Sequence, residues 1–220
     1  MVSGAKSLLN FAVVIFCCAN VFSQATDLGR PTSAPYKGDL SVFEKPNRGR
    51  KLQIARVMDL LGIKRGSAVA DIGAGSGWFT VRSARRVGKE GAVYAVEINP
   101  AYIRHISARA RKEKLMNIGT ILGKPDDPLL AKDSVDAVLL LKTYHEIAQP
   151  IALLRHVRNA MRPGAKLGII DKNGKGSDHG LDAEVVIREA AQAGFVLIAQ
   201  YDFVKADKMD YFLIFRELDR

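Results

Sequence analysis

The chain has 220 residues, a hydrophobic content of 48% and a charged content of 25%. These values are typical of a folded chain with one ordinary domain, and they exclude an intrinsically disordered chain and a multi-span membrane protein. The formal net charge of +10 would suit nucleic acid or an anionic membrane. The basic residues, however, are spread over several predicted helices instead of forming one stripe with aromatic residues, so we expect no nucleic-acid partner.

The first 25 residues have the pattern of a secretory signal peptide. Lys6 gives a basic start, residues 8–22 are almost wholly apolar, and small residues follow near Ser23 and Ala25. Since a bilayer span needs roughly 20 apolar residues, we predict cleavage near Ser23 or Ala25. The mature protein is then exported, to the periplasm or the extracellular space, without a membrane span. An uncleaved membrane anchor formed by residues 8–22 stays open as an alternative.

Both cysteines, Cys17 and Cys18, lie inside this apolar segment. After cleavage the protein would have no disulfide, no thiolate nucleophile and no zinc–thiolate site. We therefore predict no metal site.

Residues 26–47 read as a linker or an extended arm, because Pro31, Pro35 and Pro46 interrupt a stretch rich in glycine, serine and threonine. A helical pattern begins at Arg48 and stops near Gly62, with apolar residues repeating on one face. We take residues 48–220 as one domain.

Seven strands alternate with helical patterns in the rest of the chain. The predicted strands are Ala68–Ile72, Ala92–Glu97, Ile118–Gly123, Val135–Leu141, Leu167–Asp171, Phe195–Tyr201 and Tyr211–Phe215. Most are continuous apolar runs, as expected of strands covered on both faces by helices. The predicted fold class is therefore α/β, with a mostly parallel sheet between two layers of helices. The last two strands are joined only by residues 202–210, which is too short for a helical crossover, so the last strand should be antiparallel.

A glycine-rich loop follows the first strand. The strand ends in Asp71, three alternating glycines follow at Gly73, Gly75 and Gly77, and a helix begins near Trp78. Glycine allows backbone dihedrals and a close ligand approach that a Cβ atom would block, and a helix N-terminus suits a carboxylate or phosphate. The dinucleotide pattern G-x-G-x-x-G would need a glycine at Trp78, so a nicotinamide cofactor is disfavoured.

The pattern D-x-G-x-G-x-G from Asp71 to Gly77 resembles motif I of the class I S-adenosylmethionine (SAM)-dependent methyltransferases. The resemblance covers about Leu52 to Arg216. Within that family it is closest to small-molecule enzymes of the ubiquinone/menaquinone-biosynthesis type and to exported relatives. It implies a Rossmann-like sheet and a loop that holds the methionine end of SAM, with the leading acid orienting the cofactor. The loop residues assigned to SAM are Asp71, Gly73, Ala74, Gly75, Ser76, Gly77 and Trp78.

A second acid, Glu97, ends the second predicted strand and can accept hydrogen bonds from both ribose hydroxyls. We assign it, with the following Ile98, to the cofactor site. After the third strand the family often has an aspartate that contacts the adenine amine, but this chain has Lys124, which cannot accept that bond. Asp126 or Asp127 takes that role, or backbone and apolar contacts hold the adenine.

The expected function is transfer of a methyl group from SAM to a small-molecule acceptor. Two alternatives stay open, a SAM-binding protein without catalysis and a methyltransferase that acts on a protein or RNA. The export signal argues against RNA, and no N-P-P-Y-like tetrapeptide, which many base-N methylating enzymes carry, follows the fourth strand. No pattern predicts an oligomeric state.

The segment after the fourth strand carries the catalytic candidates, Tyr144 and His145. This strand should neighbour the one that ends at Asp71, so the segment should open onto the site of the transferable methyl group. An imidazole titrates near neutral pH, which suits a base that deprotonates an acceptor hydroxyl. Tyr144 would shape the acceptor pocket or donate a hydrogen bond. The alternative for His145 is a cap on the following helix or a wall of the cofactor pocket.

Overall fold

The structure is a computed structural model that describes Met1 and residues 30–218. The rest of the predicted signal peptide, including Cys17 and Cys18, lies outside the described residues. Within the described part of the chain, no helix combines the length and the apolar character that crossing a bilayer requires.

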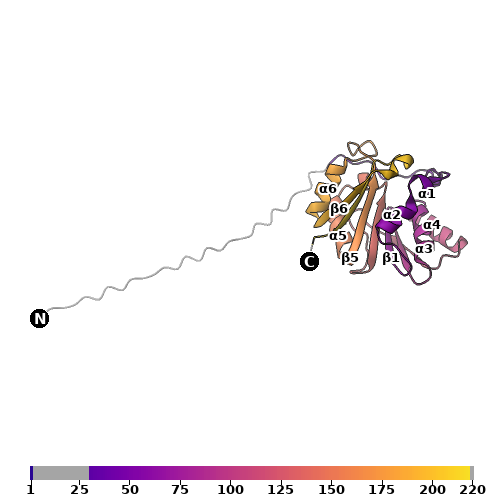
Figure 1. Ribbon diagram of the computed structural model, residues 1–220, viewed down its shortest axis with the longest axis horizontal. Helices are drawn as coiled ribbons and strands as arrows, with labels where there is room; N and C mark the ends of the chain where they lie inside the picture. Colours follow the sequence, from indigo (N-terminus) through magenta and orange to yellow (C-terminus); the bar gives the residue numbers. More distant parts are fainter. Residues whose placement is uncertain (2–29, 219–220) are drawn as a thin grey trace.

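One sheet forms the centre of the molecule (Figure 1). It has seven strands, in the order β3-β2-β1-β4-β5-β7-β6. β7 pairs antiparallel with both β5 and β6, and the remaining pairs are parallel. The predicted fold class and the antiparallel last strand are confirmed. The strands are β1 (Ala68–Ile72), β2 (Ala92–Glu97), β3 (Ile118–Leu122), β4 (Val135–Leu141), β5 (Met161–Asp171), β6 (Phe195–Tyr201) and β7 (Tyr211–Glu217).

Helices cover both faces of this sheet (Figure 1). They are α1 (Arg48–Lys51), α2 (Ile54–Leu60), α3 (Trp78–Val87), α4 (Pro100–Lys112), α5 (Pro150–Ala160) and α6 (Ala183–Gln192). Short 3₁₀ helices are η1 (Leu40–Phe43), η2 (Tyr144–Glu146) and η3 (Phe203–Asp207). Asn99 caps α4 through its side chain, and Pro100 follows at the first helical position, as the sequence predicts.

The alternation of side chains along each strand divides the core into two layers. Val69 of β1 and Leu139 of β4 pack with α2 and α3, whereas Ala70 and Leu140 pack with α5 and α6. Every residue of β1 is therefore buried. This explains why the central strands are continuous apolar runs rather than alternating ones.

Several predicted boundaries differ from the structure. The helical pattern from Arg48 is broken into α1 and α2, because Gln53 adopts a left-handed backbone with φ 50°. The fifth strand begins at Met161 rather than at Leu167, because Met161 pairs with Val135 of β4 before the register shifts. The third strand ends one residue earlier than predicted, at Leu122.

The strand order places a crevice at the carboxyl ends of β1, β2 and β4. β1 lies between β2 and β4. After β1 the chain builds the sheet toward one edge through β2 and β3, and it then crosses back to build the other half from β4 onward. In open α/β sheets ligands bind at such a point.

The described part of the arm, residues 30–47, runs across these strand ends. Its first half is bound by Ser33, whose N–H donates to the carbonyl of His145 at 3.1 Å. Further along, the Tyr102 hydroxyl of α4 donates to the carbonyl of Gly38 at 3.0 Å. The arm is thus packed on the domain by contacts to elements far away in the sequence.

Candidate active site

A cavity of about 1170 Å³ occupies the crevice. Its walls come from the glycine loop after β1, from the ends of β2, β4 and β5, and from the arm. Ligand pockets usually have volumes of roughly 300–1,000 Å³. This cavity has room for a nucleoside-sized ligand together with a small second molecule.

The glycine loop forms one wall with its backbone. Gly73, Gly75 and Gly77 have φ values of 71°, 56° and 75°, a region that side chains disfavour. A Cβ atom on Gly73 would lie 2.3 Å from the Thr143 hydroxyl, so the loop and the segment after β4 approach too closely for any other residue. Gly77 does not line the cavity, because its Cα faces Ile106 of α4.

Two buried acids stand behind this loop at the ends of β1 and β2. The Thr80 hydroxyl donates to Asp71 at 2.6 Å. Burial is the main reason that the pKa of Asp71 rises to about 7. Glu97 accepts the N–H of Gly75 at 2.8 Å and that of Ile98 at 3.0 Å, and burial raises its pKa as well. Glu97 thus fixes the loop, Asp71 is bonded to α3, and both acids line the cavity.

The arm covers the cavity from the other side. Phe43 lies against the loop, since a Cβ atom on Gly75 would be 3.6 Å from its ring. Glu44 accepts a hydrogen bond from the Ser76 hydroxyl at 2.7 Å and forms an ion pair with Arg109 of α4. These contacts join the arm to the loop whose backbone forms the opposite wall.

Trp78, the first residue of α3, is almost fully buried and lines the cavity. The guanidinium groups of Arg48 and Arg82 lie over its ring, at 4.4 and 3.9 Å from the ring centre. Arg48 also donates to the carbonyl of Phe43. Trp78 therefore supports the base of the arm.

The wall beyond β2 contains Ile98, which is 42% exposed, together with Lys124 and Pro125. Asp126 and Asp127 do not line the cavity. Asp127 caps the turn at Leu129 instead. The predicted adenine contact through Asp126 does not agree with this placement, and apolar and backbone groups form the wall there.

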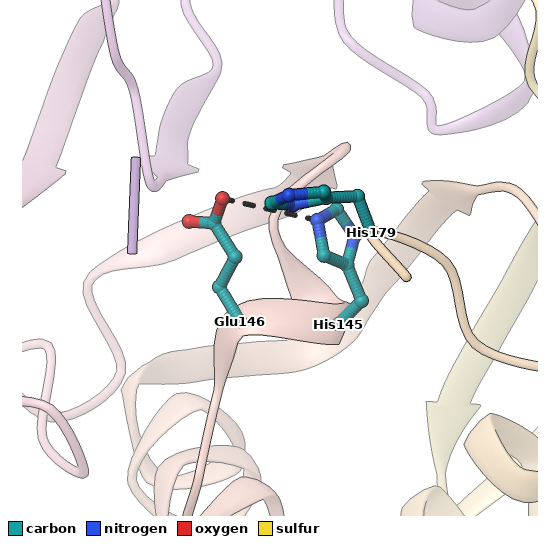
Figure 2. Close-up of side chains that lie close together, drawn as sticks. All are labelled: His145, Glu146 and His179. Carbon is teal, nitrogen blue, oxygen red and sulfur yellow. Dashed lines mark ion pairs between the residues drawn. The ribbon is translucent and has the colours of Figure 1, made fainter. Parts of the chain in front are cut away.

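The opposite end of the cavity carries His145, on η2 directly after β4. The ring is 1% exposed, and its Nδ1 lies 2.9 and 2.8 Å from the two carboxylate oxygens of Asp171 at the end of β5. Its Nε2 is 3.8 Å from the Glu146 carboxylate. His179, from the loop between β5 and α6, meets His145 with its ring perpendicular at 5.9 Å between centres (Figure 2).

Tyr144 points away from this group. It is fully buried, does not line the cavity, and its hydroxyl donates to Glu189 of α6 at 2.9 Å. Burial raises its pKa well above the usual value. The predicted role of Tyr144 in the acceptor pocket therefore does not agree with the structure. The short 3₁₀ turn directs neighbouring side chains to opposite sides, so His145 faces the cavity and Tyr144 the core.

Lysines add positive charge to the same end of the cavity. Lys142 and Lys172 line it beside Asp171, and Lys208 lines the cavity as well; no hydrogen bond or ion pair of their ammonium groups with a described residue is found. Burial lowers the pKa of Lys142, and the nearby positive charges of Arg48, Lys45 and Lys172 lower it further. A negatively charged ligand would relieve this repulsion.

The sequence predicts the loop, both acids, His145 and the arm. It does not predict the part that Asp171, Glu146 and His179 take in the site, or that the arm lines the cavity. Asp171 had the signal of an acid at a strand end. His179 had none, since it belongs to a loop without a motif and reaches the site only through the fold.

Comparison with known proteins agrees with this geometry. Residues 69–164 match the family model of the methyltransferase domain. The match covers somewhat less than half of the chain, and over those residues the chain is similar to a methyltransferase domain. Its matched region holds the glycine loop, both strand-end acids and His145.

The chain is similar to a ubiquinone/menaquinone biosynthesis C-methyltransferase UbiE of Idiomarina loihiensis, 24% identical over 52% of this chain and 46% of that protein. It is also similar to a protein-L-isoaspartate O-methyltransferase of Methanothrix thermoacetophila, 25% identical over 53% and 52%. The match thus spans about half the length of these relatives.

Among solved structures, a SAM-dependent methyltransferase from Aquifex aeolicus superposes with a TM-score of 0.72. The match covers 81% of this chain and 98% of that one at 22% identity. At this identity the likeness shows the fold.

Proposed function

We propose that this protein binds SAM and transfers its methyl group to a small acceptor. The observation that carries the proposal is the placement of Asp71, the glycine loop and Glu97 along one wall of a cavity that continues to His145. The chain is similar both to a methyltransferase of ubiquinone/menaquinone biosynthesis and to a protein-L-isoaspartate methyltransferase. This similarity supports the reaction type, and the class of acceptor is argued from the residues of the site.

The residues of the cavity fit SAM. The backbone of Gly73, Ala74, Gly75 and Ser76 leaves space that side chains would fill, and it would hold the methionine end. Asp71, as a carboxylate, would face the positive charges of that end, and Glu97 would accept the ribose hydroxyls. Ile98, Lys124 and Pro125 would hold the adenine. When bound, SAM supplies an electrophilic methyl group on a sulfonium sulfur.

The chain's own contribution is alignment and exclusion of water. The arm lies against the glycine loop with Phe43 and Glu44, so it would cover the methionine end of the cofactor and help to align it. His145 and its neighbours lie after β4, where they would contact the acceptor and assist loss of its proton.

The size of the cavity supports a small acceptor over a macromolecule. About 1170 Å³ has room for SAM together with one small molecule at the end that holds His145. The unpaired lysines at this end, Lys142 and Lys172, favour an acceptor with negative charge.

The first test is calorimetry on the full chain with SAM, S-adenosylhomocysteine and NADH. We expect binding of the first two and none of NADH. Gly75→Val should abolish binding, because its side chain would fill the space between the loop and Phe43. The matched control is Gly164→Val. Gly164 has a similar left-handed backbone, with φ 81°, but a Cβ atom there would meet no other atom within 4 Å. Normal SAM binding by Gly75→Val would contradict the proposed site.

The second test follows the methyl group. The protein is incubated with methyl-labelled SAM and a cell extract, and label is expected among small molecules. Label only in protein or RNA would contradict a small acceptor, and SAM binding without any transfer would identify a non-catalytic binding protein.

A further inference from the structure

We propose that His145, Glu146 and His179 form a binding site for a divalent transition-metal cation, Zn²⁺ before others, at the acceptor end of the cavity. The proposal deepens the proposed function, on which its catalytic part rests. It adds a site to a chain whose sequence predicts no metal site.

The three side chains converge from two separate parts of the chain. One donor atom from each lies within 4.8 Å of the other two, and the His145 Nε2 is 3.8 Å from the Glu146 carboxylate. His145 and Glu146 come from η2 after β4, and His179 comes from the loop after β5. Their polar ends point toward one another (Figure 2).

Asp171 orients the His145 ring for this role. Both of its carboxylate oxygens lie within 2.9 Å of Nδ1, and one of them also accepts the backbone N–H of His145 at 3.2 Å. A proton on Nδ1 then faces Asp171, and the lone pair of Nε2 faces Glu146 and the cavity. A carboxylate behind a histidine in this way is the usual outer contact of a metal-binding imidazole.

The backbone holds His179 at this place at an energetic cost. Its φ is 59°, a left-handed value that is sparsely populated for residues other than glycine. Its N–H donates to the Ser33 hydroxyl at 3.0 Å, and that hydroxyl donates to the carbonyl of Gly176 at 2.6 Å. These two hydrogen bonds join the arm to the loop between β5 and α6, next to the contact between the His179 and His145 rings.

The donor set suits zinc. Two imidazoles and one carboxylate, with a fourth position open, form a common catalytic zinc site. Tetrahedral ligands at about 2.0–2.1 Å from zinc are about 3.3 Å apart, so the widest pair must move closer by roughly 1.5 Å. His179 is exposed and can make this movement. The carboxylates of Glu146 and Asp171 offset the two charges of the ion.

The open fourth position determines the acceptor class. It faces the cavity, which all three ligands line. A hydroxyl oxygen bound there would have a lowered pKa and would lose its proton to water near neutral pH. We therefore infer an acceptor with an ionisable hydroxyl. In this arrangement the His145 Nε2 coordinates the metal instead of accepting the proton itself.

The test measures zinc binding without any activity. The full chain is prepared without an affinity tag and with Cys17→Ser and Cys18→Ser, because thiolates bind zinc. Titration with Zn²⁺ against a competing chelator should show one ion per chain. His179→Ala and Glu146→Gln should weaken zinc binding at least about 10-fold. His179 is exposed, so its removal should leave the fold intact.

The control variants are His105→Ala and His156→Ala, which remove the two histidines outside the cluster. They should bind zinc as the parent does. No zinc binding by the parent protein would overturn the proposal, and so would equal binding by the parent, His179→Ala and Glu146→Gln.

A double comparison separates this site from the SAM site. Gly75→Val should lose SAM and keep zinc, whereas His179→Ala should lose zinc and keep SAM. Once an acceptor is known, His145→Ala and His179→Ala should both lower kcat by about 10²-fold. A loss with His145→Ala alone, in a protein that binds no zinc, would show that His145 acts as a base and would overturn the metal site.

Discussion

Asp71 is a carboxyl group that the fold prefers to keep protonated. It is fully buried, and its only hydrogen bond to a side chain among the described residues comes from Thr80. Burial raises its pKa from the model-peptide range near 3.9 to about 7. A positively charged ligand near Asp71 would favour the ionised carboxylate and so lower this pKa.

This shift predicts a pH dependence of stability. Because the pKa is higher in the folded state, the protonated carboxyl stabilises the fold below pH of about 4. That contribution is lost as the pH rises to about 7. The loss amounts to up to about 4 kcal/mol for a fully buried group. We expect the free energy of unfolding to fall over this range. In Asp71→Asn, which keeps an acceptor for Thr80, the fall should be smaller.

Urea unfolding of both proteins without ligand, at several pH values between 4.5 and 7.5, measures the difference. Parallel curves for the parent protein and Asp71→Asn would show that Asp71 is ionised throughout this range.

At the scale of elements, the arm and the glycine loop form the two sides of one cavity. The loop follows from its own glycines, whereas the arm is placed by partners elsewhere. Arg30 pairs with Glu189 of α6 at 2.8 Å, Ser33 bonds to the loop that carries His179, and Glu44 bonds to Ser76 and Arg109. These contacts make the arm a cover whose opening would admit ligand.

We therefore expect Glu44→Ala to weaken SAM binding by about 10-fold, mainly through faster dissociation, because the variant no longer ties the arm to Ser76. The stability of the fold should change by less than about 1 kcal/mol, since the ion pair with Arg109 is partly exposed. Stopped-flow dissociation and urea unfolding measure the two quantities.

The matched control for this prediction is Asp59→Ala. Asp59 pairs with Arg86 on the outer surface, and neither residue lines the cavity. Its removal should leave SAM dissociation unchanged. Equal rates for Glu44→Ala and the parent protein would mean that the arm does not restrain the ligand.

At the scale of the whole molecule, the residues proposed for binding and catalysis lie together at the carboxyl ends of the strands. The carboxyl ends of β1, β2 and β4 supply Asp71, Glu97 and His145 to one cavity, and Asp171 at the end of β5 contacts His145 from behind. The rest of the molecule supports this edge through two apolar layers. The net charge of +10 leaves unpaired lysines at the acceptor end, which is consistent with a negatively charged acceptor.

The predicted export of the protein is also a property of the whole chain. We propose that the first 25 residues are removed at Ser23 or Ala25, because a short apolar run follows Lys6 and small residues follow the run. N-terminal sequencing of the protein from the membrane-free fraction checks this. An intact Met1 in that fraction would contradict export by cleavage.

The sequence by itself determined the sheet, the loop and the reaction type. Strands buried on both faces need continuous apolar runs, and a connection as short as residues 202–210 forces an antiparallel pair. The backbone conformation after Asp71 needs glycine whatever the rest of the fold does. These features depend on neighbouring residues, so the local pattern records them.

Only the tertiary structure decided the break at Gln53, the side to which Tyr144 points, and the meeting of His179 with His145 and Glu146. It also decided that the arm would cover the cavity. Each of these depends on partners distant in the chain, such as Glu189 for Tyr144 and Ser33 for His179. A one-dimensional pattern carries no information about such pairs, because they exist only when packing brings them together.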